Sequence, residues 1–156
     1  MIYHDDYIGS VYLVKTKCTG SFLFLLAPNT KLNVIIAYLT SIMGLYSRKI
    51  IAWTFFRTME VSCIIDTINK AKARRSTELP LILHSDRGSQ YVSREYRKAA
   101  AKIQLSYSKK AFSWDNACIE SFHSMLKREW ISRFKIRDYS HAYRLIFEYI
   151  ESFYNT

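Results

Sequence analysis

The order of apolar and polar positions along the chain predicts alternating strands and helices. Two runs rich in β-branched and aromatic residues, 33–43 and 49–55, predict strands. The short connection at 44–47 indicates that they form an antiparallel hairpin. Between residues 60 and 75 the apolar positions change to the period of an amphipathic helix, at Val61, Ile64, Ile65, Ile68 and Ala71.

The second half of the chain continues this alternation. A short apolar strand at 81–84 follows Pro80 and ends at Ser85 and Asp86. The elements predicted after it are a helix at 93–103, a strand at 105–108, a helix from Asp115 to about Arg133, and a last helix capped by Asp138 or Ser140. The apolar face of that last helix consists of Ala142, Leu145, Ile146, Tyr149, Ile150 and Phe153. We therefore expect an α/β domain with a mixed sheet and flanking helices, which is the outline of a ribonuclease H-like fold.

Charge adds a partner class to this outline. The 156 residues are 49% apolar, enough for one domain with a core, and carry a formal charge of +10. Between Asp86 and Arg137 twelve bases face five acids, a net of +7. Such a field favours a polyanion, DNA above all, although basicity for solubility alone is the alternative reading.

Cysteine usage and hydropathy point to the compartment. The three cysteines, Cys18, Cys63 and Cys118, are dispersed and form no CxxC pair, which argues for a reducing compartment and against a zinc module. The longest uncharged run, 32–47, contains polar residues and is better read as strand than as a membrane span. We expect a soluble, cytoplasmic protein that does not bind membranes.

Two carboxylates are candidates for the chemistry. Asp86 follows a predicted strand, where ligand sites of open α/β sheets gather, but it could also be a loop residue making a turn. Glu120 lies one turn into the helix that begins at Asp115, and it shares a helical face with His123, Ser124 and Lys127. That face could hold a metal at Glu120 and a phosphate at Lys127, or be an ordinary solvated face. Phosphodiester chemistry suits carboxylates, because two Mg²⁺ ions on oxygen ligands can stabilise the attacking and leaving oxygens.

Four blocks carry a resemblance to a known family. They are 45–53 (LYSRKIIAW), 84–91 (HSDRGSQY), 114–123 (WDNACIESFH) and 126–127 (LK). With them the chain resembles the catalytic core of insertion-sequence DDE transposases, the branch related to retroviral integrases. The resemblance covers residues 34–156 and implies DNA integration and transposition by metal-dependent phosphoryl transfer.

The resemblance also assigns roles to individual residues. It implies that Asp86 and Glu120 are catalytic and bind Mg²⁺ or Mn²⁺ as the second and third members of the acidic triad. It makes Asp115 and Asn116 the helix cap that presents Glu120. The bases nearest to the site, Lys127, Lys109, Lys110 and Arg87, are expected to bind DNA. The implied partners are element ends and target DNA, and identical copies of the chain in an oligomer.

The chain departs from the family pattern at three places. No Asp or Glu occurs from Tyr7 to Met59, although the triad needs an Asp on the first strand, which the family spacing would place within 22–31. Gly44 stands where the family has Asp. The chain stops at Thr156, where relatives continue into a basic tail. We expect residues 1–30 to be an unmatched, irregular segment and 31–156 to be the core, without part of the first strand and the tail.

These departures leave several readings open. The favoured one is a truncated transposase core, enzymatic by descent, with little strand-transfer activity by itself unless Asp5 or Asp6 replaces the missing acid. The alternatives are a non-enzymatic DNA-binding or dimerising remnant, a nuclease acting on RNA–DNA hybrids, and a membrane-surface protein. The aromatic residues Tyr107 and Trp114, which flank the Lys109–Lys110 loop, could stack on frayed bases or pack in the core.

Overall fold

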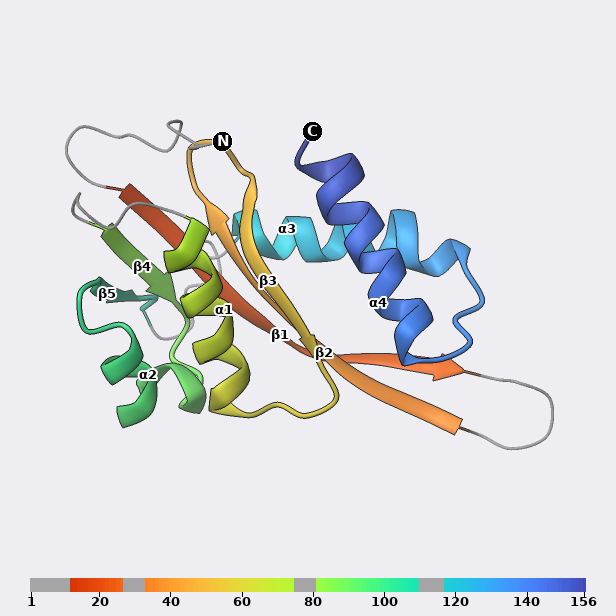
Figure 1. Cartoon of the computed structure of the whole chain (residues 1–156), viewed down its shortest axis with the longest axis horizontal. Helices are drawn as coiled ribbons and strands as arrows, with labels where there is room; N and C mark the ends of the chain where they lie inside the picture. Colours follow the sequence, from red (N-terminus) through yellow and green to blue (C-terminus); the bar gives the residue numbers. More distant parts are fainter. Residues whose placement is uncertain (1–11, 27–32, 75–80, 110–116) are drawn as a thin grey trace.

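The fold is built on one five-stranded sheet with strand order β3-β2-β1-β4-β5. The computed structural model describes residues 12–26, 33–74, 81–109 and 117–156. The strands are β1 (Tyr12–Leu26), β2 (Asn33–Gly44), β3 (Ile50–Phe56), β4 (Leu81–Ser85) and β5 (Gln104–Tyr107). The first three pair antiparallel, whereas β4 and β5 continue the sheet in parallel, so the sheet is mixed (Figure 1). The expected α/β class is confirmed, as is the antiparallel pair at 33–43 and 49–55.

The central strand is the main difference from the sequence prediction. No element is predicted before residue 31, yet β1 lies there and pairs with β2 on one side and β4 on the other. Its sequence mixes lysines, threonines and Gly20 with apolar residues, so it lacks a strand-like alternation. Pairing with two neighbours specifies this strand, which agrees with the strong context dependence of β propensity. The hairpin of β1 and β2 also crosses the boundary expected after residue 30.

One face of the sheet is covered by α1 (Val61–Arg74), η1 (Ser89–Val92) and α2 (Arg94–Ala99) (Figure 1). Successive side chains of a strand alternate between the two faces, so each face receives its own apolar set. The buried residues here are Ile42, Ile64, Ile68, Leu83, Tyr91 and Tyr96. The helix predicted at 60–75 is confirmed. The one predicted at 93–103 stops at Ala99, because the following turn is held by tighter bonds such as Ile103 N to Ala100 O, 2.8 Å.

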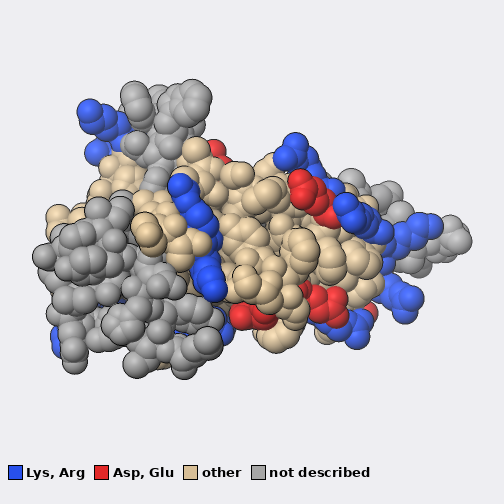
Figure 2. Space-filling model, turned by 90° about the horizontal axis from the view of Figure 1, so that it is seen from above, with Lys and Arg blue, Asp and Glu red and all other residues tan. Residues whose placement is uncertain are grey.

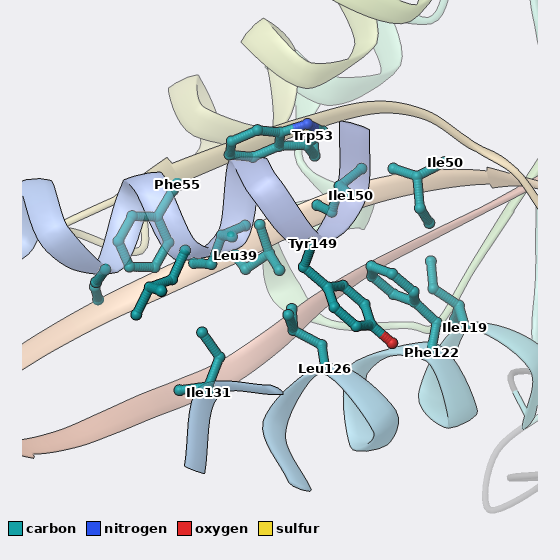
Figure 3. Packing of buried hydrophobic residues seen from close by; sticks show 14 of the residues in the cluster. Leu39, Ile50, Trp53, Phe55, Ile119, Phe122, Leu126, Ile131, Tyr149 and Ile150 are labelled. Atoms are coloured by element: carbon teal, nitrogen blue, oxygen red, sulfur yellow. The ribbon is translucent and has the colours of Figure 1, made fainter. Parts of the chain in front are cut away.

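The opposite face carries the larger core. It is covered by α3 (Ala117–Met125), which runs on as η3 (Leu126–Trp130) and η4 (Ile131–Arg133), and by α4 (Tyr139–Phe147) with its extension η5 (Glu148–Tyr154). Figure 3 shows Ile119, Phe122 and Leu126 pointing from this first helix toward side chains of the sheet and of the last helix. All three are fully buried. This packing fixes α3 against the sheet.

The last helix begins as the sequence predicts and ends differently. Asp138 is its N-cap, and its Oδ1 accepts a hydrogen bond from the backbone N of His141 at 2.7 Å. Most of the predicted apolar face is buried, but Phe153 is 65% exposed. The reason is that η5 is a π-helix, whose wider turn moves Phe153 away from the face predicted with 3.6 residues per turn.

Candidate active site

Asp86 directly follows β4 and is half-buried. Its Oδ1 accepts a hydrogen bond from the backbone N of Gly88 at 2.8 Å, which closes a turn two residues on. The turn predicted from the sequence is thus present. Its hydrogen bond orients the Asp86 carboxylate through Oδ1. The space at Gly88 is tight, because a Cβ at this position would lie 3.0 Å from Asp86 Oδ1 and 3.2 Å from Gln90 Oε1.

His84 of β4, two residues before Asp86, contacts Ser106 of β5 and Ser108, which follows β5. His84 Nδ1 lies 3.0 Å from Ser106 Oγ, and His84 Nε2 lies 3.0 Å from Ser108 Oγ. The backbone N of Ser108 donates to Ser85 O at 3.0 Å, which extends the parallel pairing beyond the strand ends. Sequence reasoning singled out neither serine. Their alternation with apolar residues in a short predicted strand was the available signal, and it carries no indication of a partner.

Glu120 is half-buried in the first turns of α3. The neighbouring apolar residues of this helix face the core, as predicted. His123 differs from the prediction, because it is 4% exposed and therefore not part of a solvated polar face. Its Nε2 lies 2.7 Å from Ser41 Oγ of β2, so a buried hydrogen bond ties the helix to the sheet one turn after Glu120. Ser41 was also missed, since nothing in the sequence of β2 indicates a polar contact across the core.

The backbone pairing of β1 with β4 shows which residues of β1 lie beside the end of β4. Lys15 is the register partner of His84 in the parallel pair of β1 and β4. Continuing this register by two residues brings Thr16 and Lys17 level with Ser85 and Asp86. Lys17 is in turn the register partner of Ser41. Of the stretch 22–31, where the family spacing puts the missing acid, residues 22–26 lie farther along the hairpin with β2. Residues 27–31, like Asp5 and Asp6, lie outside the described residues.

Asp86 and Glu120 are candidate ligands of a divalent cation by their chemistry. Carboxylate oxygens such as those of Asp86 and Glu120 are the ligands that Mg²⁺ prefers. Within the part of the chain that the structure describes, no three His, Cys, Asp or Glu side chains gather as a metal-binding group. The three-acid set that the resemblance implies is therefore not assembled among the described residues.

The bases named from the sequence take different places. Lys127, Lys109 and Arg87 are exposed, and Arg87 Nε donates to Ser108 O at 3.1 Å. Exposed bases also gather on η3, η4 and the following loop, at Arg128, Arg133, Lys135 and Arg137. Figure 2 shows Lys and Arg, with acids among them, at the end of the molecule where η3 and η4 lie. Lys110, Trp114, Asp115 and Asn116 fall outside the described residues.

Two further predictions concern surface and membrane. Tyr107 packs against the core on the α1 side, and its hydroxyl donates to Tyr91 O at 3.0 Å, so the packing alternative describes this residue. Within the described ranges, no helix is long and apolar enough to cross a membrane.

Comparison with known proteins agrees with the sequence resemblance. The model of the integrase core domain matches residues 27–138. The chain is 36% identical over 121 residues to the transposase for insertion sequence element IS904 of Lactococcus lactis, covering 76% of this chain and 48% of that protein. It is 37% identical over 122 residues to transposase InsF for insertion sequence IS3A of Escherichia coli, covering 76% of this chain and 42% of that protein. The chain thus spans less than half the length of these curated relatives.

Solved structures give the same fold. A chain of the simian T-cell lymphotropic virus intasome, in complex with the PP2A regulatory subunit B56 gamma, superposes with a TM-score of 0.67 at 16% identity, covering 91% of this chain and 50% of that one. The HTLV-2 integrase catalytic core domain in complex with magnesium superposes with a TM-score of 0.61 at 10% identity, covering 88% of this chain and 83% of that one. The ribonuclease H-like fold and the resemblance to insertion-sequence transposases are confirmed, and the chain belongs to the integrase core domain family.

Proposed function

We propose that this chain is the catalytic core of an insertion-sequence transposase, descended from enzymes that join DNA by metal-dependent phosphoryl transfer. The observation that carries the proposal is the position of Asp86, held by the Gly88 turn at the C-terminal end of β4 in an integrase-core sheet. Glu120 supports it from α3, which packs against β1, the strand beside β4. Magnesium or manganese, when bound, would supply the charge that stabilises the attacking and leaving oxygens.

We further propose that the chain by itself has little or no strand-transfer activity. The support is that residues 12–26, the whole of β1, include no Asp or Glu, and that the register of β1 and β4, continued past His84, brings Thr16 and Lys17 level with Ser85 and Asp86. A two-acid set would hold a cation more weakly than a three-acid set. The direct test is cleavage and strand transfer on element-end DNA with Mg²⁺ or Mn²⁺. Robust turnover that Asp86→Asn abolishes would overturn this proposal, and its loss on Asp6→Asn would assign the missing role to Asp6.

A restoration experiment tests the position of the missing acid. Adjacent strand positions alternate between the two faces of a sheet, so Thr16→Asp and Lys17→Asp are each other's controls. We expect one of them to tighten Mn²⁺ binding by roughly tenfold or more, a factor typical of adding support to a metal site. The other should leave it unchanged. Equal binding by both variants and the original chain would contradict the register argument.

A second candidate function is DNA binding without catalysis. It is favoured by the exposed bases along η3, η4 and the loop after them, which do not depend on the acidic site. Binding to DNA through phosphates should fall steeply with salt and need no divalent cation. Fluorescence anisotropy across a salt series, with and without Mg²⁺, separates the two functions. The same samples, measured by light scattering, test the proposal that copies of the chain assemble into an oligomer.

A further inference from the structure

Ser108 makes hydrogen bonds to three residues that flank Asp86. It is 5% exposed and directly follows β5. Its backbone N donates to Ser85 O at 3.0 Å, its Oγ lies 3.0 Å from His84 Nε2, and its carbonyl oxygen accepts a bond from Arg87 Nε at 3.1 Å. Residues 84, 85 and 87 are therefore all attached to one residue of the neighbouring strand.

These attachments limit how the Asp86 backbone can move. The bond from Ser108 N fixes the carbonyl oxygen of Ser85, directly before Asp86, and the Arg87 side chain adds a second attachment after it. Because each residue has only two soft backbone dihedrals, these attachments reduce the freedom of the backbone at Asp86. The carboxylate is then oriented by the bond from Gly88 N. His84 strengthens the arrangement, because Ser106 Oγ lies 3.0 Å from its other ring nitrogen. Hydroxyl groups both donate and accept, so the two serines match either tautomer of the ring.

We propose that Ser108 is a positioning residue for Asp86, acting through His84, Ser85 and Arg87; its role in catalysis rests on the proposed function of Asp86 as a metal ligand. Ser108 acts by its hydroxyl and by its backbone. Substitution by alanine removes the hydroxyl contact with His84 and keeps both backbone contacts. The position of the carboxylate should loosen while the sheet stays paired.

Hydrogen exchange of the Gly88 amide measures this directly, because that amide bonds the Asp86 carboxylate. In Ser108→Ala we expect Gly88 to exchange roughly fivefold faster, the factor expected for loss of one hydrogen bond. Ser108→Thr keeps a hydroxyl and should restore slow exchange. Ser140→Ala, the same change at an exposed position of α4, is the control and should have no effect. If Ser108→Ala does not fold, Arg87→Ala removes another attachment at an exposed residue and should also speed Gly88 exchange.

Two outcomes would overturn the proposal. One is unchanged Gly88 exchange in Ser108→Ala and in Arg87→Ala. The other is faster exchange of Gly88 together with amides of β2 and β3 by the same factor, which would show a general loss of stability. Mn²⁺ titration forms the second arm, in which Ser108→Ala should bind about tenfold more weakly. If the original chain binds Mn²⁺ no better than Asp86→Asn, the proposed metal role of Asp86 fails, and Gly88 exchange still decides whether Ser108 positions it.

Discussion

The two candidate acids, Asp86 and Glu120, are held in place in different ways. Asp86 is held by a local set of hydrogen bonds between the ends of β4 and β5 and by its own turn to Gly88. Glu120 is held by a helix whose apolar side is buried in the larger core, with one buried polar link from His123 to Ser41. Hydrogen bonds fix a short segment and contribute modestly to stability, whereas apolar packing fixes a whole helix. Disturbing the packing that holds the Glu120 helix should therefore affect the entire domain, whereas the effect of disturbing the hydrogen bonds around Asp86 should stay local.

The largest loss of stability should come from disturbing the apolar packing of the helix that carries Glu120. Phe122 is fully buried and packs against Tyr149 and Tyr154, with ring centroids 6.2 and 4.8 Å away. Phe122→Ala should lower the free energy of unfolding by about 3–5 kcal/mol, because it removes a large apolar side chain and leaves a cavity. Urea unfolding measures this loss. Phe153→Ala, the same change at a side chain 65% exposed, should cost about 1 kcal/mol or less. Similar losses for the two variants would contradict the packing argument.

A smaller loss of stability should follow from breaking the hydrogen bond between His123 of the same helix and Ser41. Ser41→Ala removes the hydroxyl that lies 2.7 Å from the buried His123 ring. It should cost about 1–3 kcal/mol, because a buried ring nitrogen loses its partner in a place that water does not reach. Thermal and urea unfolding give the magnitude. Ser124→Ala, on the exposed side of the same helix, is the matched control and should change stability little. Equal effects of the two substitutions would mean that the link does not anchor α3.

A substitution in the turn that holds Asp86 should change metal binding more than the stability of the fold. Gly88→Ala places a Cβ 3.0 Å from Asp86 Oδ1, so the carboxylate must shift. We expect Mn²⁺ binding to weaken by about tenfold, with a stability loss of about 1 kcal/mol or less. The double variant with Gln90→Ala removes the second close contact, at 3.2 Å, and shows how much of the effect comes from Asp86. A large loss of stability with unchanged Mn²⁺ binding would contradict the view that the contacts around Asp86 act locally.

The smallest effect concerns alkaline pH and the core around α3. Burial raises the pKa of Tyr149 and of Tyr154 above the ordinary value of 10.0. Well below pH 10.0 both hydroxyls are neutral in the folded and unfolded states, so stability is independent of them there. As pH rises further, the unfolded chain loses these protons first, and stability falls until the folded pKa values are passed. Tyr149→Phe should make the decline less steep in urea unfolding between neutral and alkaline pH. An unchanged slope would argue against the buried position of this hydroxyl.

Sequence reasoning reached most of the fold because the elements concerned follow simple patterns. The helix at Val61–Arg74 and the pair of β2 and β3 have clear periods, and Asp138 is a typical cap. It missed β1, whose lysines and threonines hide a strand that pairing on both sides specifies. It also placed His123 on a polar face, since helical spacing identifies neighbours on the surface of a helix and does not say which direction the core lies in.

For the candidate site, the sequence by itself singled out Asp86 and Glu120 as the proposed acids and determined the family to which the motifs around them belong. Motif spacing is a local property of the chain, so Asp86 after a strand and Glu120 in a helix could be read directly. Tertiary structure alone decided what holds them, because Ser108 with His84 and Ser41 with His123 are joined across 24 and 82 residues of chain. It also decided which residues of β1 pair with β4 up to His84, since strand register is set by pairing between distant segments rather than by the residues of one strand.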